Sequence, residues 1–487
     1  MGVLKRIILI LCTVSMLIFS LLSSLFLLPA LAFAGTCWNG GSSGTAPWYV
    51  KDGDGGSDSI LQPDVNYCIN TVATEGDTVY VPVGSSTWSS RINITKGIHI
   101  IGAGIDKTTI TNGIAASKTG DYIFYYMPDS PATDGMVEIT GFTFDGGNSG
   151  GAISIVNLSS TAIHNFRIHH NKIQNSNYND SGEKQAGVYT RGNTFGLIDN
   201  NIFYNNLKDA VFLGNGTDSW ITFPATSNIG TNNYLYFEDN TTSTLTTNRS
   251  FAIGETGEGA RWVARHNTID ATNCNNTTGI SDIHGDTLNR GVVASEFYDN
   301  TVNNGYQMIG IDYRGGTGII YNNHINMTGG SYEGRIRVRE EYSSCTDAKG
   351  CAGDNIGCGD EVNNGYIWNN LNDYASTIIN IVKSDTYGCL AEKDNWWDDY
   401  NNSPEYFTKD VHANRNLTRC IAEDVYWETD TKKLYRCTAT NTWTLVYKPY
   451  IYPHPLQGIS NKGATVINTI GGLNAIDIVG GLNVINQ

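Results

Sequence analysis

Short strand-like segments that end in asparagine recur along this chain, and the recurrence constrains its fold more than any other feature. Each segment joins apolar residues to an asparagine and one further residue, usually apolar, as in RIHHNKI, LIDNNIF and VARHNTI. The turn asparagines lie 23 to 47 residues apart, at Asn171, Asn201, Asn240, Asn267, Asn300, Asn323 and Asn370. A unit of about 23 residues, lengthened by loops in some turns, is typical of a solenoid of parallel strands.

Asparagine suits such a repeat for two reasons. It tolerates the left-handed backbone that a tight turn needs, and equivalent side chains can stack in a ladder between coils. Composition agrees, since 54 glycines, 27 tyrosines and only 11 prolines favour many short strands and turns over helices. The sequence therefore predicts an all-β solenoid of parallel strands.

Three earlier segments extend the repeat towards the N-terminus: GDTVYVPVGSSTW (Gly76–Trp88), ITKGIHIIGAGIDKTTI and VEITGFTFDGG. Together with WYVKDGDGGSD they give the chain a resemblance to the pectate-lyase-like superfamily, over roughly Trp48 to Asp398. The resemblance implies a right-handed, single-stranded parallel β-helix. It implies no single activity, because this superfamily includes lyases, hydrolases, epimerases, phage tailspikes, adhesins and structural proteins.

The first 34 residues have the pattern of a secretory signal peptide. Lys5 and Arg6 precede an apolar stretch, Ile7–Leu31, that closes on Ala-Phe-Ala before Gly35. An uncleaved membrane anchor is the alternative, because the stretch is long enough to cross a bilayer. We expect a mature chain that begins at Gly35, is secreted or held at the cell surface, and has no membrane contact after cleavage.

The cysteines of an exported chain are expected to form disulfides rather than metal sites. We predict the pairs Cys37–Cys68, near the N-terminus, and Cys420–Cys437, which would close a short hairpin. The other five lack the paired C-x-x-C spacing of a structural zinc site. These five are Cys274, Cys345, Cys351, Cys358 and Cys389.

Charge and acidic motifs bear on partners and cofactors. The formal net charge of −16 disfavours nucleic acids and anionic membranes as partners. The acidic stretch Asp52–Asp58 is similar to a calcium-binding loop, but its twelfth position is Pro63 where a carboxylate is needed. We therefore predict neither a cofactor nor a metal, with calcium at this stretch as the weaker alternative.

The repeat stops before the C-terminus, which divides the chain. We predict a β-helix over 35–415 and a disulfide-closed β-meander over 416–457, with a turn at Asp430–Lys433, that covers the open edges of the last coil. The tail, 458–487, repeats itself as TIGGLNAID and IVGGLNVIN. It either docks on its own domain or donates a strand to a neighbour, which would make the protein self-assemble.

Polar side chains are denser between Glu255 and Arg339 than elsewhere, and two segments in this range, ISDIHGDTLNRG and IDYRGGTG, bring several of them close together. On one face of adjacent coils they would supply an acid, a base and a cation within reach of a sugar ring. β-Elimination needs a base and neutralisation of a uronate, and hydrolysis needs two carboxylates, so this set serves either reaction. The predicted catalytic residues are Asp282, His284, Arg290, Asp312 and Arg314.

The alternative is structural: the aspartates would cap turns and the arginines would pair with them across coils. The same alternative applies to a second charged group, in which neighbouring coils would form ion-pair ladders. Its members are Glu238, Glu258, Arg261, Arg265 and Glu296.

Known active-site motifs of the superfamily do not match this chain. The Gly-His-Gly and Arg-Ile-Lys of polygalacturonases are replaced by Ile283-His284-Gly285 and Arg335-Ile336-Arg337. No stretch matches the acidic calcium cluster of pectate lyases.

Aromatic pairs are a further sugar-binding feature, because aromatic rings stack on pyranose faces. The substrate-binding candidates are Trp396, Trp397 and Asp286.

Two hypotheses follow from the whole sequence. The first is a secreted protein that binds, and as a lyase or glycoside hydrolase cleaves, an extracellular polysaccharide. The second is a non-catalytic adhesin or fibre subunit, in which the charged rows are structural.

Overall fold

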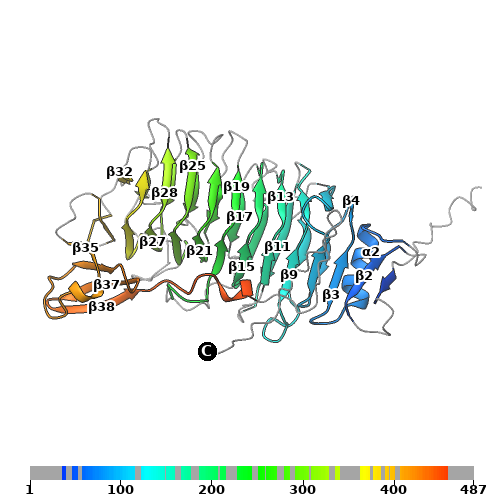
Figure 1. The fold of residues 1–487 in the computed structure, drawn as a ribbon, viewed down its shortest axis with the longest axis horizontal. Coiled ribbons are helices and arrows are strands. Elements are labelled where there is room, and N and C mark those ends of the chain that lie inside the picture. The colour runs from blue at the N-terminus through cyan, green and yellow to red at the C-terminus, as the bar shows by residue number, and fades with distance from the viewer. Residues whose placement is uncertain are drawn as a thin grey trace, which may run out of the picture.

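The computed structural model describes a chain that is nearly all β-structure (Figure 1). None of the helices in the described part of the chain is long and apolar enough to cross a membrane. The residues described are 36–39, 46–52, 57–115, 122–147, 150–159, 166–176, 186–206, 209–214, 228–243, 251–257, 259–270, 279–285, 291–305, 309–327, 335–339, 362–372, 377–384, 390–393, 395–400 and 406–458.

Three sheets, A, B and C, run along the molecule, and the chain visits them in turn, so that a coil adds one strand to each. Apart from β1–β2 and β31–β32 at the ends, which are antiparallel, the strands pair in parallel. Sheet A contains β1 (Thr36–Trp38), β2 (Trp48–Lys51), β3 (Thr78–Val81), β6 (His99–Gly102), β9 (Val137–Thr140), β12 (Phe166–His169), β15 (Gly196–Asp199), β18 (Leu235–Glu238), β21 (Arg261–Arg265), β24 (Ala294–Tyr298), β27 (Thr317–Tyr321), β30 (Gly365–Trp368) and β34 (Trp396–Asp398). The parallel β-helix that the repeat predicts is therefore confirmed.

The other two sheets complete each coil. Sheet B contains β4 (Gly84–Trp88), β7 (Thr108–Asn112), β10 (Thr143–Asp145), β13 (Lys172–Gln174), β16 (Ile202–Tyr204), β19 (Thr241–Ser243), β22 (Thr268–Asp270), β25 (Thr301–Gly305), β28 (His324–Met327), β31 (Leu371–Asn372) and β32 (Thr377–Ile378). Sheet C contains β5 (Ile92–Ile94), β8 (Tyr122–Tyr126), β11 (Gly151–Asn157), β14 (Val188–Gly192), β17 (Asp209–Gly214), β20 (Phe251–Thr256), β23 (Gly279–Ile283), β26 (Ile309–Tyr313), β29 (Ile336–Arg339) and β33 (Ile381–Ser384).

The core lies inside the coils, where side chains of equivalent positions stack along the axis. Because side chains alternate between the two faces of a strand, every second residue points inward. In sheet B the central inward row is almost wholly apolar and is buried: Ile110, Phe144, Ile173, Phe203, Thr242, Ile269, Val302 and Ile325.

The turn asparagines form a continuous ladder between sheets A and B. The Oδ1 atom of Asn267 accepts hydrogen bonds from the backbone N–H and the Nδ2 of Asn240, at 3.0 and 3.2 Å. Its own Nδ2 donates to the carbonyls of Phe237 and Arg265, both at 2.9 Å. The pattern repeats from Asn171 to Asn370, which confirms the predicted ladder.

The left-handed residue of each turn precedes the asparagine of the ladder, which corrects the prediction that the asparagine itself is left-handed. The bend between the two sheets needs one left-handed residue, and the asparagine after it directs its amide at the next coil. These residues have φ between 50° and 57°: His170, Asn200, Asp239, His266, Asp299, Asn322 and Asn369.

The longest interval in the repeat is one coil with an inserted loop. Asn323 and Asn370 are 47 residues apart, yet the backbone N–H of the first donates to the Oδ1 of the second at 3.2 Å. Strands β28 and β29 lie between them in the chain, followed by β30. The insertion lies between β29 and β30 and does not interrupt the ladder.

A four-stranded sheet follows the coils and contains β35 (Phe407–Asp410), β36 (Val425–Glu428), β37 (Lys433–Ala439) and β38 (Thr442–Tyr447). The last three form the predicted meander, closed by the predicted disulfide Cys420–Cys437. Strand β35 pairs in parallel with β36 and lies before residue 416, so this C-terminal sheet begins earlier than the sequence indicated.

The C-terminal sheet packs on the outward face of sheet A, and not only across the end of the last coil. A shared apolar cluster joins Trp427, Leu434 and Tyr447 to Tyr321 and Trp368 of β27 and β30. The physical reason is that late coils of sheet A carry aromatic rather than polar residues on their outward face, and these need a cover.

After β38 the chain runs back along sheet A as a strap, residues 448–458, which ends in the short helix η5 (Pro455–Gly458) near β15 (Figure 1). Arg265 donates to the strap carbonyls of Tyr450 and Ile451, both at 2.9 Å. The backbone N–H of His454 donates to Glu238 at 2.8 Å. Polar side chains of sheet A therefore hold the strap.

Short helices occupy the described chain's two ends. The N-terminal helix α2 (Gln62–Tyr67) continues as η1 (Cys68–Val72), and the predicted disulfide Cys37–Cys68 joins it to β1. A single turn, η4 (His412–Asn414), follows β35. The predicted signal peptide, the tail from residue 459 and the remaining cysteines lie outside the described residues.

Candidate functional site

A row of charged side chains occupies the outward face of sheet C. Glu255 on β20 is in register with Asp282 on β23, which is in register with Asp312 on β26 and then with Arg337 on β29. Neighbouring strands are about 4.8 Å apart, so residues of equal register lie side by side. The residues that flank each charged residue in its strand point into the core, as Ile311 and Tyr313 do on either side of Asp312. The charged row therefore faces outward.

Strand β20 carries one extra residue relative to both of its neighbours, between Phe251 and Gly254, and Glu255 follows directly. At Gly254, where the register resumes, an added Cβ would lie 2.0 Å from the carbonyl oxygen of Val211. Only glycine fits so close to the neighbouring strand. Such bulges re-aim side chains and are frequent beside active sites.

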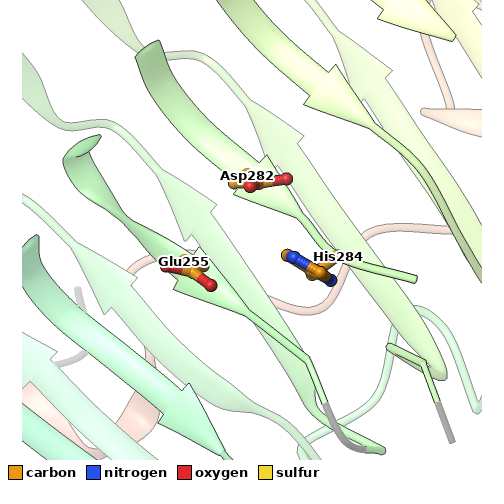
Figure 2. Close-up of side chains that lie close together, drawn as sticks. All are labelled: Glu255, Asp282 and His284. Carbon is orange, nitrogen blue, oxygen red and sulfur yellow. The ribbon is translucent and has the colours of Figure 1, made fainter. Parts of the chain in front are cut away.

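Glu255, Asp282 and His284 converge at this bulge. Figure 2 shows the two acids on neighbouring strands and His284 just beyond the end of the strand that carries Asp282. One oxygen of each carboxylate and one imidazole nitrogen all lie within 4.8 Å of one another. We call these three residues the acid–histidine cluster.

Arginines of the following coils pair with the aspartates of the row. The Nε of Arg314 donates to Asp282 at 2.8 Å, and its Nη2 donates to the other oxygen of the same carboxylate. Arg337 donates to both oxygens of Asp312, at 2.8 and 2.6 Å, and Arg339 donates to it from Nη2 at 2.9 Å. These three arginines are therefore already engaged with carboxylates.

The two aspartates have different acidities. Burial, together with the charges of Asp312 and Glu255, raises the pKa of Asp282 to about 6, against the lowering effect of Arg314. Burial also acts to raise the pKa of Asp312. The hydrogen bonds from Arg337 and Arg339 outweigh this effect and lower the pKa of Asp312 below its usual value. Paired carboxyl groups with separated pKa values are a frequent sign of acid and base roles.

Burial distinguishes the parts of the row. Asp282, Asp312 and Arg314 are only 4% to 6% exposed, and Glu255 is equally covered. His284 is half-buried, so solvent reaches the cluster from its side. At the Asp312 end the carboxylate is buried and paired with Arg337 and Arg339, whose side chains are 26% and 28% exposed. Pairing of charges across coils is what the structural alternative predicts, whereas at the acid–histidine cluster His284 is the residue that solvent reaches.

The cluster also has a donor set for a metal, with two carboxylate oxygens and one imidazole nitrogen, which first-row transition metals accept. Arg314 already supplies a positive charge beside Asp282. This positive charge would repel a metal ion at the cluster.

Four of the five predicted catalytic residues lie on this face, namely Asp282, His284, Asp312 and Arg314. Arg290, and the substrate-binding candidate Asp286, lie outside the described residues. Three members of the site were not chosen from the sequence: Glu255, Arg337 and Arg339. In their strands these charged residues alternate with buried residues, and this alternation in the sequence would have pointed to them.

Burial argues against the predicted stacking of a sugar on Trp396 and Trp397, which are 3% and 2% exposed. Trp396 belongs to the core and its Nε1 donates to Asp398 at 2.8 Å. Trp397 stacks on Tyr366 with ring centres 5.1 Å apart, under the C-terminal sheet. The core encloses the ring of Trp396 and the C-terminal sheet covers that of Trp397, so neither offers a free face to a sugar.

Three members of the second charged group, Glu238, Arg265 and Glu296, make structural contacts. Glu238 and Arg265 form an ion pair of 2.6 Å with fully buried side chains, and Arg265 also holds the strap. Glu296 accepts a hydrogen bond from Tyr447 of the C-terminal sheet. These residues attach the C-terminal part to sheet A, which confirms a structural role, while Glu258 lies outside the described residues.

No family model and no curated protein matches the chain. Among solved structures it is similar to a surface adhesin of Streptococcus pneumoniae, at 12% identity over 76% of this chain and 91% of that one, with a TM-score of 0.36. It is also similar to the A-module of a mannuronan C-5 epimerase of Azotobacter vinelandii, at 14% identity over 64% of this chain and 89% of that one, with a TM-score of 0.31. A Paenibacillus alginate lyase is similar at 10% identity over 66% and 95% of the two chains, with a TM-score of 0.27. Similarity this low carries no argument about activity.

Proposed function

We propose that the outward face of sheet C binds an extracellular polysaccharide and that the acid–histidine cluster hydrolyses a glycosidic bond in it. The observation that supports this most is the convergence of Glu255, Asp282 and His284 within 4.8 Å on two neighbouring coils, at a bulge. A linear glycan laid along the β-helix axis would cross these coils one after another.

The roles follow from acidity and position. Asp282, whose pKa of about 6 keeps a protonated fraction near neutral pH, donates a proton to the leaving glycosidic oxygen. Glu255 attacks the anomeric carbon, because one oxygen of each carboxyl group lies within 4.8 Å of the other. So close an approach fits the short spacing of retaining enzymes, about 5 to 5.5 Å, better than the spacing of about 6.5 to 9.5 Å in inverting ones. Water then hydrolyses the glycosyl ester, and Asp282 takes its proton back. His284 stands beside both carboxyl groups and exchanges protons with solvent.

Hydrolysis is favoured over β-elimination by the state of the arginines. Elimination from a uronate needs a free positive charge to neutralise the sugar carboxylate. Arg314, Arg337 and Arg339 are each hydrogen-bonded to Asp282 or Asp312 at this face. A substrate whose reacting sugar is neutral fits this arrangement better than a uronate does.

The test compares Asp282→Asn and His284→Ala with the wild type on a polysaccharide that it cleaves. Asp106→Asn, an exposed carboxylate at a distant turn, is the control. We expect losses of about 10² to 10⁴-fold for Asp282→Asn, as is usual for a lost general acid, and full activity for the control. Retained anomeric configuration in the first product supports the assigned roles, whereas unsaturated products or full activity of Asp282→Asn contradict them.

A second candidate function is binding without cleavage, as an adhesin or fibre subunit. The ion-pair ladder of Asp282, Arg314, Asp312 and Arg337 favours it, because a row of mutually satisfied charges stabilises coils without any substrate. Under this candidate Asp282→Asn lowers stability while no polysaccharide is ever cleaved.

A further inference from the structure

A hollow of about 600 Å³ lies on the other side of the molecule, between sheet A, the C-terminal sheet and the strap. Its walls come from the ends of β24, β27 and β30, from the turn after β36, and from Tyr450 to Tyr452 of the strap. Pockets that bind small molecules usually measure about 300 to 1,000 Å³. The hollow shares no residue with the acid–histidine cluster, so it is a separate place.

The floor of the hollow is a rigid aromatic column. Tyr298, Tyr321 and Trp368 stack on successive coils, with ring centres 4.7 and 4.3 Å apart and nearly parallel planes. Trp427 of the C-terminal sheet packs against Trp368 at 5.0 Å. These rings are buried, so the floor is formed before any ligand arrives.

One aromatic ring at the rim is accessible. Tyr452 is 45% exposed and stacks by one face on His266, with ring centres 3.6 Å apart. Its hydroxyl donates to Asp239 at 2.7 Å, which fixes the ring in place. An aromatic ring held in this way presents a flat apolar surface of the kind that stacks on a pyranose ring.

The rim carries an excess of positive charge. Lys409, Lys432 and Lys448 line the hollow, and Lys409 is paired with Asp399 at 2.6 Å. Among the described residues no carboxylate forms an ion pair with Lys432 or Lys448. Two uncompensated ammonium groups at one hollow stand out in a chain with a net charge of −16, and they favour an anionic ligand.

Neutral hydrogen-bonding groups complete the lining. Asn322 and Asn369 lie at the turns of successive coils, where the Nδ2 of Asn369 donates to the Oδ1 of Asn322 at 2.8 Å. Thr429 and Thr431 face them from the C-terminal sheet. Amides and hydroxyls spaced around an aromatic floor match the hydroxyl groups of a sugar rather than a simple inorganic anion.

We propose that the hollow binds an oligosaccharide that carries carboxylate groups, with Lys432 and Lys448 on the carboxylates and Tyr452 against a sugar ring. This site holds a glycan without cleaving it, because among the residues that the structure describes Asp299 is the one carboxylate lining it, and Asp299 accepts a hydrogen bond from Asn322. The inference does not depend on hydrolysis at sheet C.

The test is calorimetric titration of the secreted chain with trisaccharides of galacturonate, mannuronate and glucuronate, and with a neutral trisaccharide. The variant is Lys432→Ala/Lys448→Ala, and Lys432→Arg/Lys448→Arg keeps the charge. Lys107→Ala removes an exposed lysine elsewhere. Each protein also carries Glu255→Gln, so that cleavage at sheet C does not disturb the titration.

We expect at least one oligouronate to bind, at least tenfold more weakly to the double alanine variant, with little change for the arginine and Lys107→Ala variants. Raised salt should weaken binding, since the contacts are ionic. Equal affinity for the neutral trisaccharide, equal affinity of the double alanine variant, or binding of inorganic phosphate as tight as that of the oligouronate would overturn the proposal. Absence of binding for all three oligouronates would overturn it as well.

Discussion

The hydroxyl of Tyr447 on β38 donates a hydrogen bond of 2.7 Å to the carboxyl group of Glu296 on β24, and both side chains are buried. The backbone N–H of Gly230 donates a second, at 2.6 Å. Burial raises the pKa of Glu296 to about 7, against the lowering effect of these hydrogen bonds and of Arg265. This contact between the coils and the C-terminal sheet therefore changes its charge between acid and neutral pH.

The raised pKa predicts how stability depends on pH. The folded state holds a proton on Glu296 up to about pH 7, whereas the unfolded chain releases it near 4.5. The stabilisation is therefore fully present below pH 4.5 and is lost as the pH rises through 7, by a few kcal/mol, since one pKa unit corresponds to about 1.4 kcal/mol. Glu296→Gln, which stays neutral, should match the wild type at pH 4 and exceed its melting temperature at pH 8. Identical pH profiles of the two proteins would exclude this account.

The asparagine ladder predicts a large effect from one small change. Asn267→Ala removes the acceptor of the Asn240 backbone N–H and the donor to the carbonyls of Phe237 and Arg265. Each buried group left without a partner costs about 1 to 3 kcal/mol, so we expect a loss of about 3 to 5 kcal/mol. Chemical unfolding measures it, with the exposed Asn70→Ala as control. A loss no greater than that of the control would mean that the ladder is not stabilising.

Arg265 holds the strap on sheet A, so its loss is expected to loosen the strap. Its replacement by methionine leaves Glu238 buried without its cation and removes the bonds to the carbonyls of Tyr450 and Ile451. Breaking a buried ion pair on one side costs about 3 to 5 kcal/mol. We expect faster cleavage by a protease between residues 448 and 458, seen by mass spectrometry, while the coils stay resistant. Unchanged cleavage of the strap would contradict the role given to Arg265.

The pH dependence of hydrolysis follows from Asp282. A general acid has to be protonated, so kcat/KM should fall as the pH rises above about 6, the pKa of this carboxyl group. Arg314→Ala removes the cation that lowers this pKa, and the descending limb should move to higher pH. A profile flat between pH 5 and 8, or a limb unmoved in Arg314→Ala, would assign the acid to another residue.

The coils could be predicted from sequence because one residue type marks each turn. The ladder asparagines need neighbours of the same type above and below, so they recur even where loops separate them by 47 residues, as between Asn323 and Asn370. The position of the C-terminal sheet could not be predicted in this way. It depends on the outward side chains of β27 and β30, which look the same in sequence whether they face water or another sheet.

The site could be predicted in part. Asp282, His284, Asp312 and Arg314 lie in two short segments, and proximity along the chain was enough to group them. Glu255 is brought in by the register of β20, which the bulge before it shifts by one residue. Register across coils with loops of unequal length does not follow from sequence spacing, and neither does the burial of Trp396 and its neighbour.

Hydrolysis on sheet C is tested by the release of reducing ends from a panel of neutral and uronic polysaccharides, with residues 35–487 of the chain measured beside the Glu255→Gln variant. We predict release from at least one neutral polysaccharide without the ultraviolet absorbance of an unsaturated product, and loss of that release in Glu255→Gln, which keeps the wild-type melting temperature within a few degrees. No release from any polysaccharide, or equal release by Glu255→Gln, would contradict a hydrolytic site on sheet C and leave its charged row as a support of the coils.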